Sequence, residues 1–310
     1  MANVTEPERQ AGDWLRATDD GFVAAEGLRW HVRRFGVGPL LLLIHGTGAS
    51  GHSWAGLVDE LAGEFTLLVI DLPGHGLTDP LPTAAMSLDQ LAARVGDLLS
   101  AIGSAPDGIV GHSAGAAIAI RAALDRRIPA PKVIVSVNGA LLPFGGVAGW
   151  LFPPMARVLA TGTIASRLLA HRASQPETVA RMLAGTGAAP PAWSLGCYEA
   201  LLRRPGHVKA ALDMMAMWNL ESLKRDLPRL TVPLELIACG GDAAVPPESA
   251  FTVRDIASGA HVSYVRNLGH LAHEESPAII AELVRAAWCR CQGATRDADS
   301  APETGRERAV

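Results

Sequence analysis

Short apolar runs recur along the chain and are separated by longer stretches with helical character. The runs are rich in Leu, Ile and Val, and that at 40–44 is continuous, which is typical of strands buried on both faces. Strands are expected at 40–44, 66–70, 108–110, 132–137, 234–239 and 261–265. This alternation predicts an α/β architecture, with a mostly parallel central sheet and helices on both faces.

Helix signals lie between and after these runs. A capping-box pattern at 87–90 predicts a helix that ends near residue 102. The pair Ser276-Pro277 supplies an N-cap and a first-turn proline for a closing helix that is expected to end near Cys289. Further helices are expected at about 51–62 and 114–124.

The spacing of the strands predicts the domain organisation. The gap between the strands at 132–137 and 234–239 is too long for an ordinary crossover, so residues 143–226 are expected to form an inserted helical cap. The core then comprises 21–142 and 227–291. Residues 1–20 form an N-terminal extension, and 292–310 have little to bury, which predicts a disordered tail.

Composition limits the class of protein. The chain has 310 residues, 49% of them hydrophobic, which suffices for one large domain with an insertion. With 27 basic and 31 acidic side chains the charge pattern argues against a nucleic-acid partner and favours a small-molecule substrate. No secretory signal and no transmembrane run is evident, and the four cysteines are scattered, so a cytoplasmic protein with reduced thiols is expected.

A nucleophile motif stands between a predicted strand and a predicted helix. The sequence 111–115 has the pattern Gly-x-Ser-x-Gly, with Ser113 at its centre. Glycines allow a sharp strand-to-helix turn that holds the serine in a strained backbone conformation and exposes its hydroxyl near a helix N-terminus. We therefore expect Ser113 to be the nucleophile of a hydrolase.

A serine nucleophile needs a base and an acid to orient that base. Asp242 follows the strand at 234–239 and His270 follows the next strand, which gives the chain order Ser, Asp, His. An alternative acid position after the strand at 132–137 holds Asn138, which carries no charge. The backbone N–H groups of Thr47 and Ala114 are the expected oxyanion donors.

Other polar residues near these turns are expected to be structural. His45, His75 and His112 are interpreted as hydrogen-bonding partners of the turns, and Asp71 as a turn former. The sequence His270-x-x-His273-Glu274 lacks the spacing of zinc motifs, and Cys289-x-Cys291 lacks a second cysteine pair. The sequence therefore predicts no metal site and no cofactor.

Four soft or flat side chains in and beside the expected cap have two possible roles. They either pack as the core of the cap or line a pocket for a large planar ligand. These residues are Phe144, Met214, Met215 and Trp218.

Several segments carry a family resemblance over about residues 10–290. They are 45–50 (HGTGAS), 71–76 (DLPGHG), 111–117 (GHSAGAA), 138–144 (NGALLPF), 207–208 (HV), 213–218 (DMMAMW) and 269–275 (GHLAHEE). The chain thereby resembles the α/β-hydrolases encoded with bacteriochlorophyll-biosynthesis enzymes and called magnesium-chelatase accessory proteins.

The resemblance implies a tetrapyrrole-related role in photosynthesis. One expectation is a serine esterase that hydrolyses a carboxylic ester of a magnesium porphyrin or a later pigment intermediate. The alternative is a non-catalytic accessory that binds a porphyrin beside magnesium chelatase. Carbon–carbon bond hydrolysis and perhydrolysis also stay open, because the fold does not fix the substrate.

Overall fold

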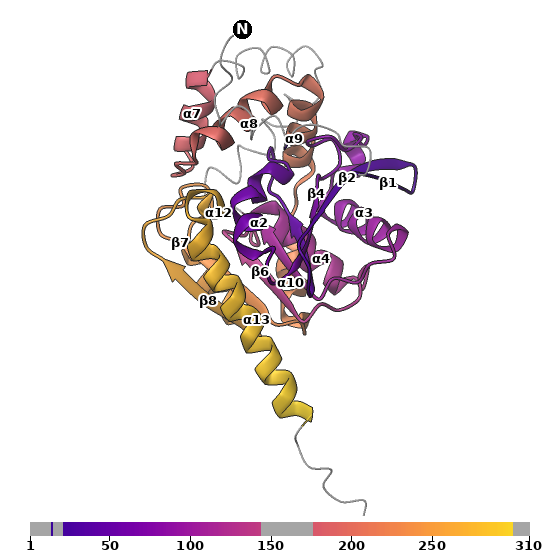
Figure 1. The fold of residues 1–310 in the computed structure, drawn as a ribbon, viewed down its shortest axis with the longest axis vertical. Coiled ribbons are helices and arrows are strands. Elements are labelled where there is room, and N and C mark those ends of the chain that lie inside the picture. Colours follow the sequence, from indigo (N-terminus) through magenta and orange to yellow (C-terminus); the bar gives the residue numbers. More distant parts are fainter. Residues whose placement is uncertain (1–13, 15–20, 144–175, 300–310) are drawn as a thin grey trace, which may run out of the picture.

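One eight-stranded sheet forms the centre of the molecule (Figure 1). The computed structural model describes Trp14 and residues 21–143 and 176–299. The strands are β1 (Phe22–Ala25), β2 (Leu28–Phe35), β3 (Leu40–Ile44), β4 (Thr66–Ile70), β5 (Gly108–His112), β6 (Val133–Val137), β7 (Leu234–Cys239) and β8 (Ala260–Val265). Their order is β1-β2-β4-β3-β5-β6-β7-β8, and the strands from β3 to β8 run parallel, which confirms the predicted sheet.

Helices cover both faces of this sheet, as predicted. They are α2 (Ala55–Leu61), α3 (Leu88–Ala101), α4 (Ala114–Leu124), α10 (Glu221–Asp226), α11 (Glu248–Ile256), α12 (Ala272–Glu275) and α13 (Pro277–Asp299). Successive residues of a strand point to opposite faces. Leu42 and Ile44 of β3 accordingly pack in a cluster with α3, α4 and α11, while Leu41 and Leu43 pack in a second cluster with α2 and α13.

The first two strands are not among the predicted ones. β1 and β2 form an antiparallel hairpin whose turn, Glu26-Gly27, has φ angles of 47° and 75°. Leu28 and Trp30 are buried while Arg29 between them is exposed. This alternation over three residues is the local signal for β2, and it differs from the continuous apolar runs of the inner strands.

Helix ends agree with the sequence signals at one helix and differ at another. The side chain of Ser87 accepts a hydrogen bond from the Gln90 N–H at 3.4 Å, so it is the N-cap of α3. The closing helix α13 ends at Asp299, ten residues beyond Cys289. The prediction of a disordered tail from Gln292 is therefore wrong for residues 292–299, because a nucleated helix propagates cheaply through residues such as Ala, Arg and Gln.

Three further helices lie together at one end of the molecule (Figure 1). They are α7 (Pro176–Ala184), α8 (Ala192–Leu202) and α9 (Pro205–Met217). Their apolar cluster also includes Ala49 and Leu271 of the core. We refer to α7–α9 as the cap helices. Of the predicted cap, residues 144–175 lie outside the described residues, and α10 packs against α4 of the core.

Some predictions concern the ends of the chain and its thiols. Of the predicted extension, only Trp14 is described, and its ring lies 5.4 Å from that of Phe35. No disulfide joins any of the four cysteines, all of which lie in the described part. None of the described helices is long and apolar enough to cross a membrane.

Candidate active site

Ser113 lies at the turn between β5 and α4, at the carboxyl edge of the sheet. Its backbone has φ 50° and ψ −116°, a conformation that non-glycine residues rarely adopt. Its carbonyl accepts hydrogen bonds from the N–H groups of Ala116 and Ala140, and its own N–H donates to Val137 O. A Cβ at Gly115 would lie 2.2 Å from Ile44 O, so this turn packs directly on the end of β3. The neighbouring strands therefore hold the strained serine in place.

Asp242 and His270 are paired beyond the ends of β7 and β8, respectively. His270 Nδ1 lies 2.8 Å from Asp242 Oδ2, and the carboxylate is 1% exposed. The second carboxylate oxygen accepts from the N–H groups of Ala244 and Val245, each at 2.8 Å. Because an ionised carboxylate only accepts, Nδ1 of His270 carries the proton and Nε2 is left with a lone pair. This is the tautomer that a general base needs.

The backbone of His270 is tethered to the strands that precede Ser113 and Asp242. Asn138 Nδ2 donates to the carbonyls of Gly269 and His270 at 2.9 and 3.0 Å, and its Oδ1 accepts from Cys239 N–H. His112 Nε2 donates to the same His270 carbonyl at 3.0 Å, and the two rings are 4.7 Å apart. The structure thus brings the His270 ring against His112, the residue before Ser113, and Asn138 acts as a tether of the His270 backbone.

The turn that carries Thr47 lies against Ser113. A Cβ at Gly46 would be 2.7 Å from His112 Nδ1 and 3.1 Å from Ser113 Cβ. Only glycine therefore permits this approach of the two turns. Ala114 is the first residue of α4, so its N–H has no acceptor within the helix. Both expected oxyanion donors are consequently next to the serine.

The residues expected around a substrate lie in different environments. Met214 is fully buried and its Sδ accepts from Thr47 Oγ1 at 3.4 Å. Met215 is 39% exposed, since adjacent residues of a helix point in different directions. Trp218 is half-buried against the core cluster, and Phe144 lies outside the described residues. A substrate-binding role for these four residues stays a prediction.

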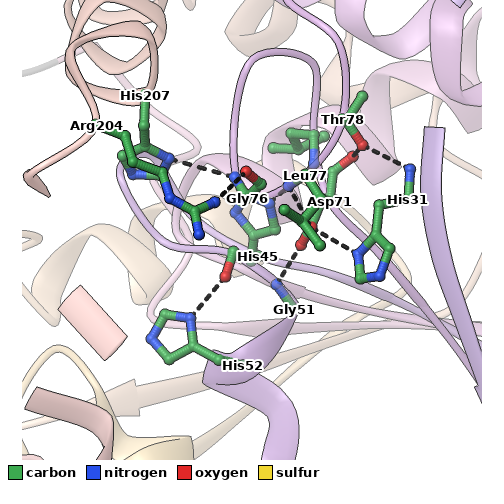
Figure 2. Close-up of polar contacts among 12 residues, drawn as sticks. His31, His45, Gly51, His52, Asp71, Gly76, Leu77, Thr78, Arg204 and His207 are labelled. Atoms are coloured by element: carbon green, nitrogen blue, oxygen red, sulfur yellow. Dashed lines mark hydrogen bonds and ion pairs between the residues drawn. The ribbon is translucent and has the colours of Figure 1, made fainter. Parts of the chain in front are cut away.

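A buried network surrounds Asp71, which is more than a turn former (Figure 2). Its carboxylate accepts from the N–H groups of Gly51 and Leu77 at 2.6 and 2.9 Å, and from His31 Nδ1 at 2.8 Å. It thereby ties the end of β4 to β2 and to the turn after β3. His45, His75 and His112 each hydrogen-bond a backbone group, in keeping with the structural role expected of them.

A second buried cluster was not expected from the sequence. The Glu274 carboxyl is bonded by the hydroxyls of Ser53 and of Ser194 and Tyr198 on α8. Burial raises the pKa of Glu274 to about 7. His273 Nε2 lies 2.8 Å from the same Ser53 hydroxyl. Within the described residues no three His, Cys, Asp or Glu side chains are placed to hold a metal ion.

Comparisons with known proteins agree with this geometry. The profile of the alpha/beta hydrolase family matches residues 41–283. The magnesium-chelatase 30 kDa subunit of Rhodobacter capsulatus is 39% identical over 239 residues, which are 76% of this chain and 82% of that protein. The N-formylmaleamate deformylase of Pseudomonas putida is 26% identical over 81% of this chain and 89% of its own length. An alpha/beta hydrolase fold protein from Burkholderia ambifaria superposes with a TM-score of 0.71 at 24% identity, covering 85% of this chain and 96% of its own.

Proposed function

Because the chain belongs to the α/β-hydrolase family, in the group that includes the magnesium-chelatase 30 kDa subunit, we propose that it is a serine hydrolase of carboxylic esters. The observation that carries this proposal is the pairing of His270 with Asp242, with the His270 ring 4.7 Å from the ring of His112, the residue before the strained Ser113. A tether or a helix cap would need neither that serine conformation nor a histidine in the base tautomer.

The residues support a two-step reaction. His270 Nε2 takes the proton of Ser113 Oγ as the oxygen attacks the ester carbonyl carbon, and the resulting oxyanion accepts from the Thr47 and Ala114 N–H groups. When the carbon–oxygen bond of the ester breaks, the imidazolium returns its proton to the leaving alcohol. Water, deprotonated by His270, then releases the acid and restores the Ser113 hydroxyl.

Labelling by a fluorophosphonate probe tests the nucleophile. The serine oxygen displaces fluoride from phosphorus, so the wild type should be labelled on Ser113 and Ser113→Ala should not. Ser100→Ala, which alters an exposed serine of α3, is the matched control and should be labelled like the wild type. A folded wild type that resists the probe, or a Ser113→Ala variant that still reacts, would contradict the proposal.

The relative from Rhodobacter capsulatus also motivates a substrate and a partner. We propose that the ester belongs to a tetrapyrrole intermediate and that the protein associates with a magnesium chelatase. Met214 lies against Thr47 and so places an adaptable side chain next to the proposed oxyanion turn. A non-catalytic accessory that only binds the porphyrin is the second candidate.

Complementation separates these two candidates. In a photosynthetic bacterium that lacks its own copy of this protein, the wild type should restore pigment synthesis. Ser113→Ala should fail to do so although the protein is present and folded. Restoration by Ser113→Ala would instead favour the binding accessory, and mass spectrometry of accumulated pigments would identify the ester that is left uncleaved.

A further inference from the structure

His207 lies at the start of cap helix α9, is 3% exposed, and has no role in the reaction as described so far. We infer that His207 is a positioning residue, which orients the Thr47 N–H of the oxyanion hole through a chain of two hydrogen-bonded peptide groups. The direction of this N–H then depends on the position of α9 relative to the core. The inference rests on the proposed function, in which Thr47 N–H stabilises the oxyanion.

The contacts of His207 fix its tautomer. The Gly76 N–H donates to Nδ1 at 3.3 Å, so Nδ1 carries a lone pair. Nε2 therefore carries the proton and donates it to the carbonyl of Gly48 at 3.0 Å. Figure 2 shows the ring against Gly76, beside Arg204. Burial lowers the pKa of His207 to about 4, so the ring is neutral near pH 7 and keeps this one donor.

The Gly48 carbonyl is the first member of a hydrogen-bonded chain. It belongs to the same peptide group as the Ala49 N–H, and that N–H donates to Gly46 O at 3.2 Å. The Gly46 carbonyl in turn belongs to the same peptide group as the Thr47 N–H. Because a trans peptide is planar, its N–H points opposite to its C=O. Holding the two carbonyls therefore sets the direction of the Thr47 N–H.

A second histidine holds the other end of this chain. The Leu72 N–H donates to His45 Nε2 at 2.9 Å, so His45 is protonated on Nδ1 and donates to Gly46 O at 2.7 Å. His45 and His207 are thus opposite tautomers, and they donate to the carbonyls of Gly46 and Gly48, the two residues on either side of Thr47. Each donation polarises the peptide that receives it, which strengthens the N–H at its far side.

The two histidines differ in where they are anchored. His45 directly follows β3 of the core, whereas His207 belongs to α9 and is 159 residues away from Gly48 in the sequence. Arg204 of the cap also bonds the Gly76 carbonyl at 3.2 Å, but it does not bond the Gly46–Gly48 turn. Met214 of α9 contacts the Thr47 hydroxyl, whereas His207 is the α9 residue that bonds the backbone of this turn. Arg204 serves as a matched cap contact without a bond to the turn.

Replacements of His207 that keep either the bond to Gly48 O or the bond from the Gly76 N–H test which of the two bonds positions Thr47. The amide nitrogen of His207→Gln can replace Nε2 and donate to Gly48 O, while the amide oxygen of His207→Asn can replace Nδ1 and accept from Gly76. We expect the second-order rate of fluorophosphonate labelling to fall at least about tenfold in His207→Asn and His207→Phe, because an oxyanion donor is worth about 10²–10³ in rate. His207→Gln and Arg204→Met should stay within about threefold of the wild type.

A measurement that needs no activity accompanies the kinetics. Nitrogen-15 NMR of histidine side chains in Ser113→Ala should show a proton on Nε2 of His207 and on Nδ1 of His45, and the exchange of the Ala49 amide hydrogen should be faster in His207→Asn than in His207→Gln. If the wild type resists the probe altogether, the proposed function fails and the NMR still tests the chain of hydrogen bonds. A proton on Nδ1 of His207, or faster labelling in His207→Asn than in His207→Gln, would overturn the inference.

Discussion

Glu274 is a carboxyl group that the fold keeps away from water. It lies on α12, four residues after His270, and its hydrogen-bond partners come from the core at Ser53 and from α8 at Ser194 and Tyr198. Burial raises its pKa from 4.5 to about 7, because desolvation penalises the charged form and the three hydroxyls offset only part of that penalty. This residue therefore links cap and core in a way that depends on pH.

Replacing Glu274 by Gln should remove one pH dependence of stability. Between pH 4.5 and 7 the folded state holds a proton that the unfolded state has lost, so the free energy of unfolding falls as pH rises, by up to about 3 kcal/mol. Glu274→Gln should lack this loss, which urea denaturation between about pH 5 and pH 8 would measure. Glu282→Gln alters an exposed carboxyl and is the control; equal pH profiles for Glu274→Gln and the wild type would contradict the assignment.

At the scale of elements, the turn from β5 to α4 depends on the absence of side chains. A Cβ at Gly115 would meet Ile44 O at 2.2 Å and His45 O at 2.6 Å, and one at Gly111 would meet Ala116 N at 2.5 Å. The obstructing atoms are backbone atoms of β3 and α4, which cannot move aside as a flexible side chain could. The glycines of the motif are therefore required by the packing of strand and helix and not by the chemistry.

Gly115→Ala should lower both stability and labelling. Overpacking of this kind costs typically about 1–3 kcal/mol, and we expect the upper part of this range because the clash is with backbone. Urea denaturation gives the free energy of unfolding, and the fluorophosphonate rate reports the displacement of Ser113. Gly63→Ala, where a Cβ meets nothing within 4 Å, is the matched control. The packing argument is wrong if the two alanine variants are equally stable.

For the whole molecule, the unusual feature is the number of neutral histidines buried beneath the cap. Burial lowers the pKa of His52 and His273 to about 3 and that of His207 to about 4, from an ordinary value of 6.5. These rings are buried between the core and the cap helices, so their protonation disfavours the folded state.

Acid should therefore unfold the protein. Below pH 6.5 the unfolded chain binds protons that the folded chain excludes, so stability falls as pH falls, by up to about 1.4 kcal/mol per pH unit for each histidine. Three such groups outweigh the opposite trend of Glu274. The urea midpoint should drop between about pH 6.5 and pH 5, and His273→Gln should reduce the slope. A midpoint that is constant over this range would refute the prediction.

The sequence by itself determined the features that depend on local sterics and local burial. An inner strand such as β3 is a continuous apolar run because both faces of the sheet are covered, and the turn at Ser113 needs glycines wherever it occurs. Ser113, Asp242 and His270 follow β5, β7 and β8, respectively, which gives their order along the chain. These patterns involve residues that are close together in the chain, so they can be recognised from the sequence alone.

Only the tertiary structure decided which polar residues meet across long separations. His207 reaches Gly48 over 159 residues, and Ser194 reaches Glu274 over 80. Neither contact has a local pattern, since a buried histidine or glutamate is costly by itself and becomes tolerable only when distant partners supply its hydrogen bonds. The contact between the cap and the Gly46–Gly48 turn is therefore a property of the folded molecule, whereas the turn at Ser113 follows from its neighbouring glycines.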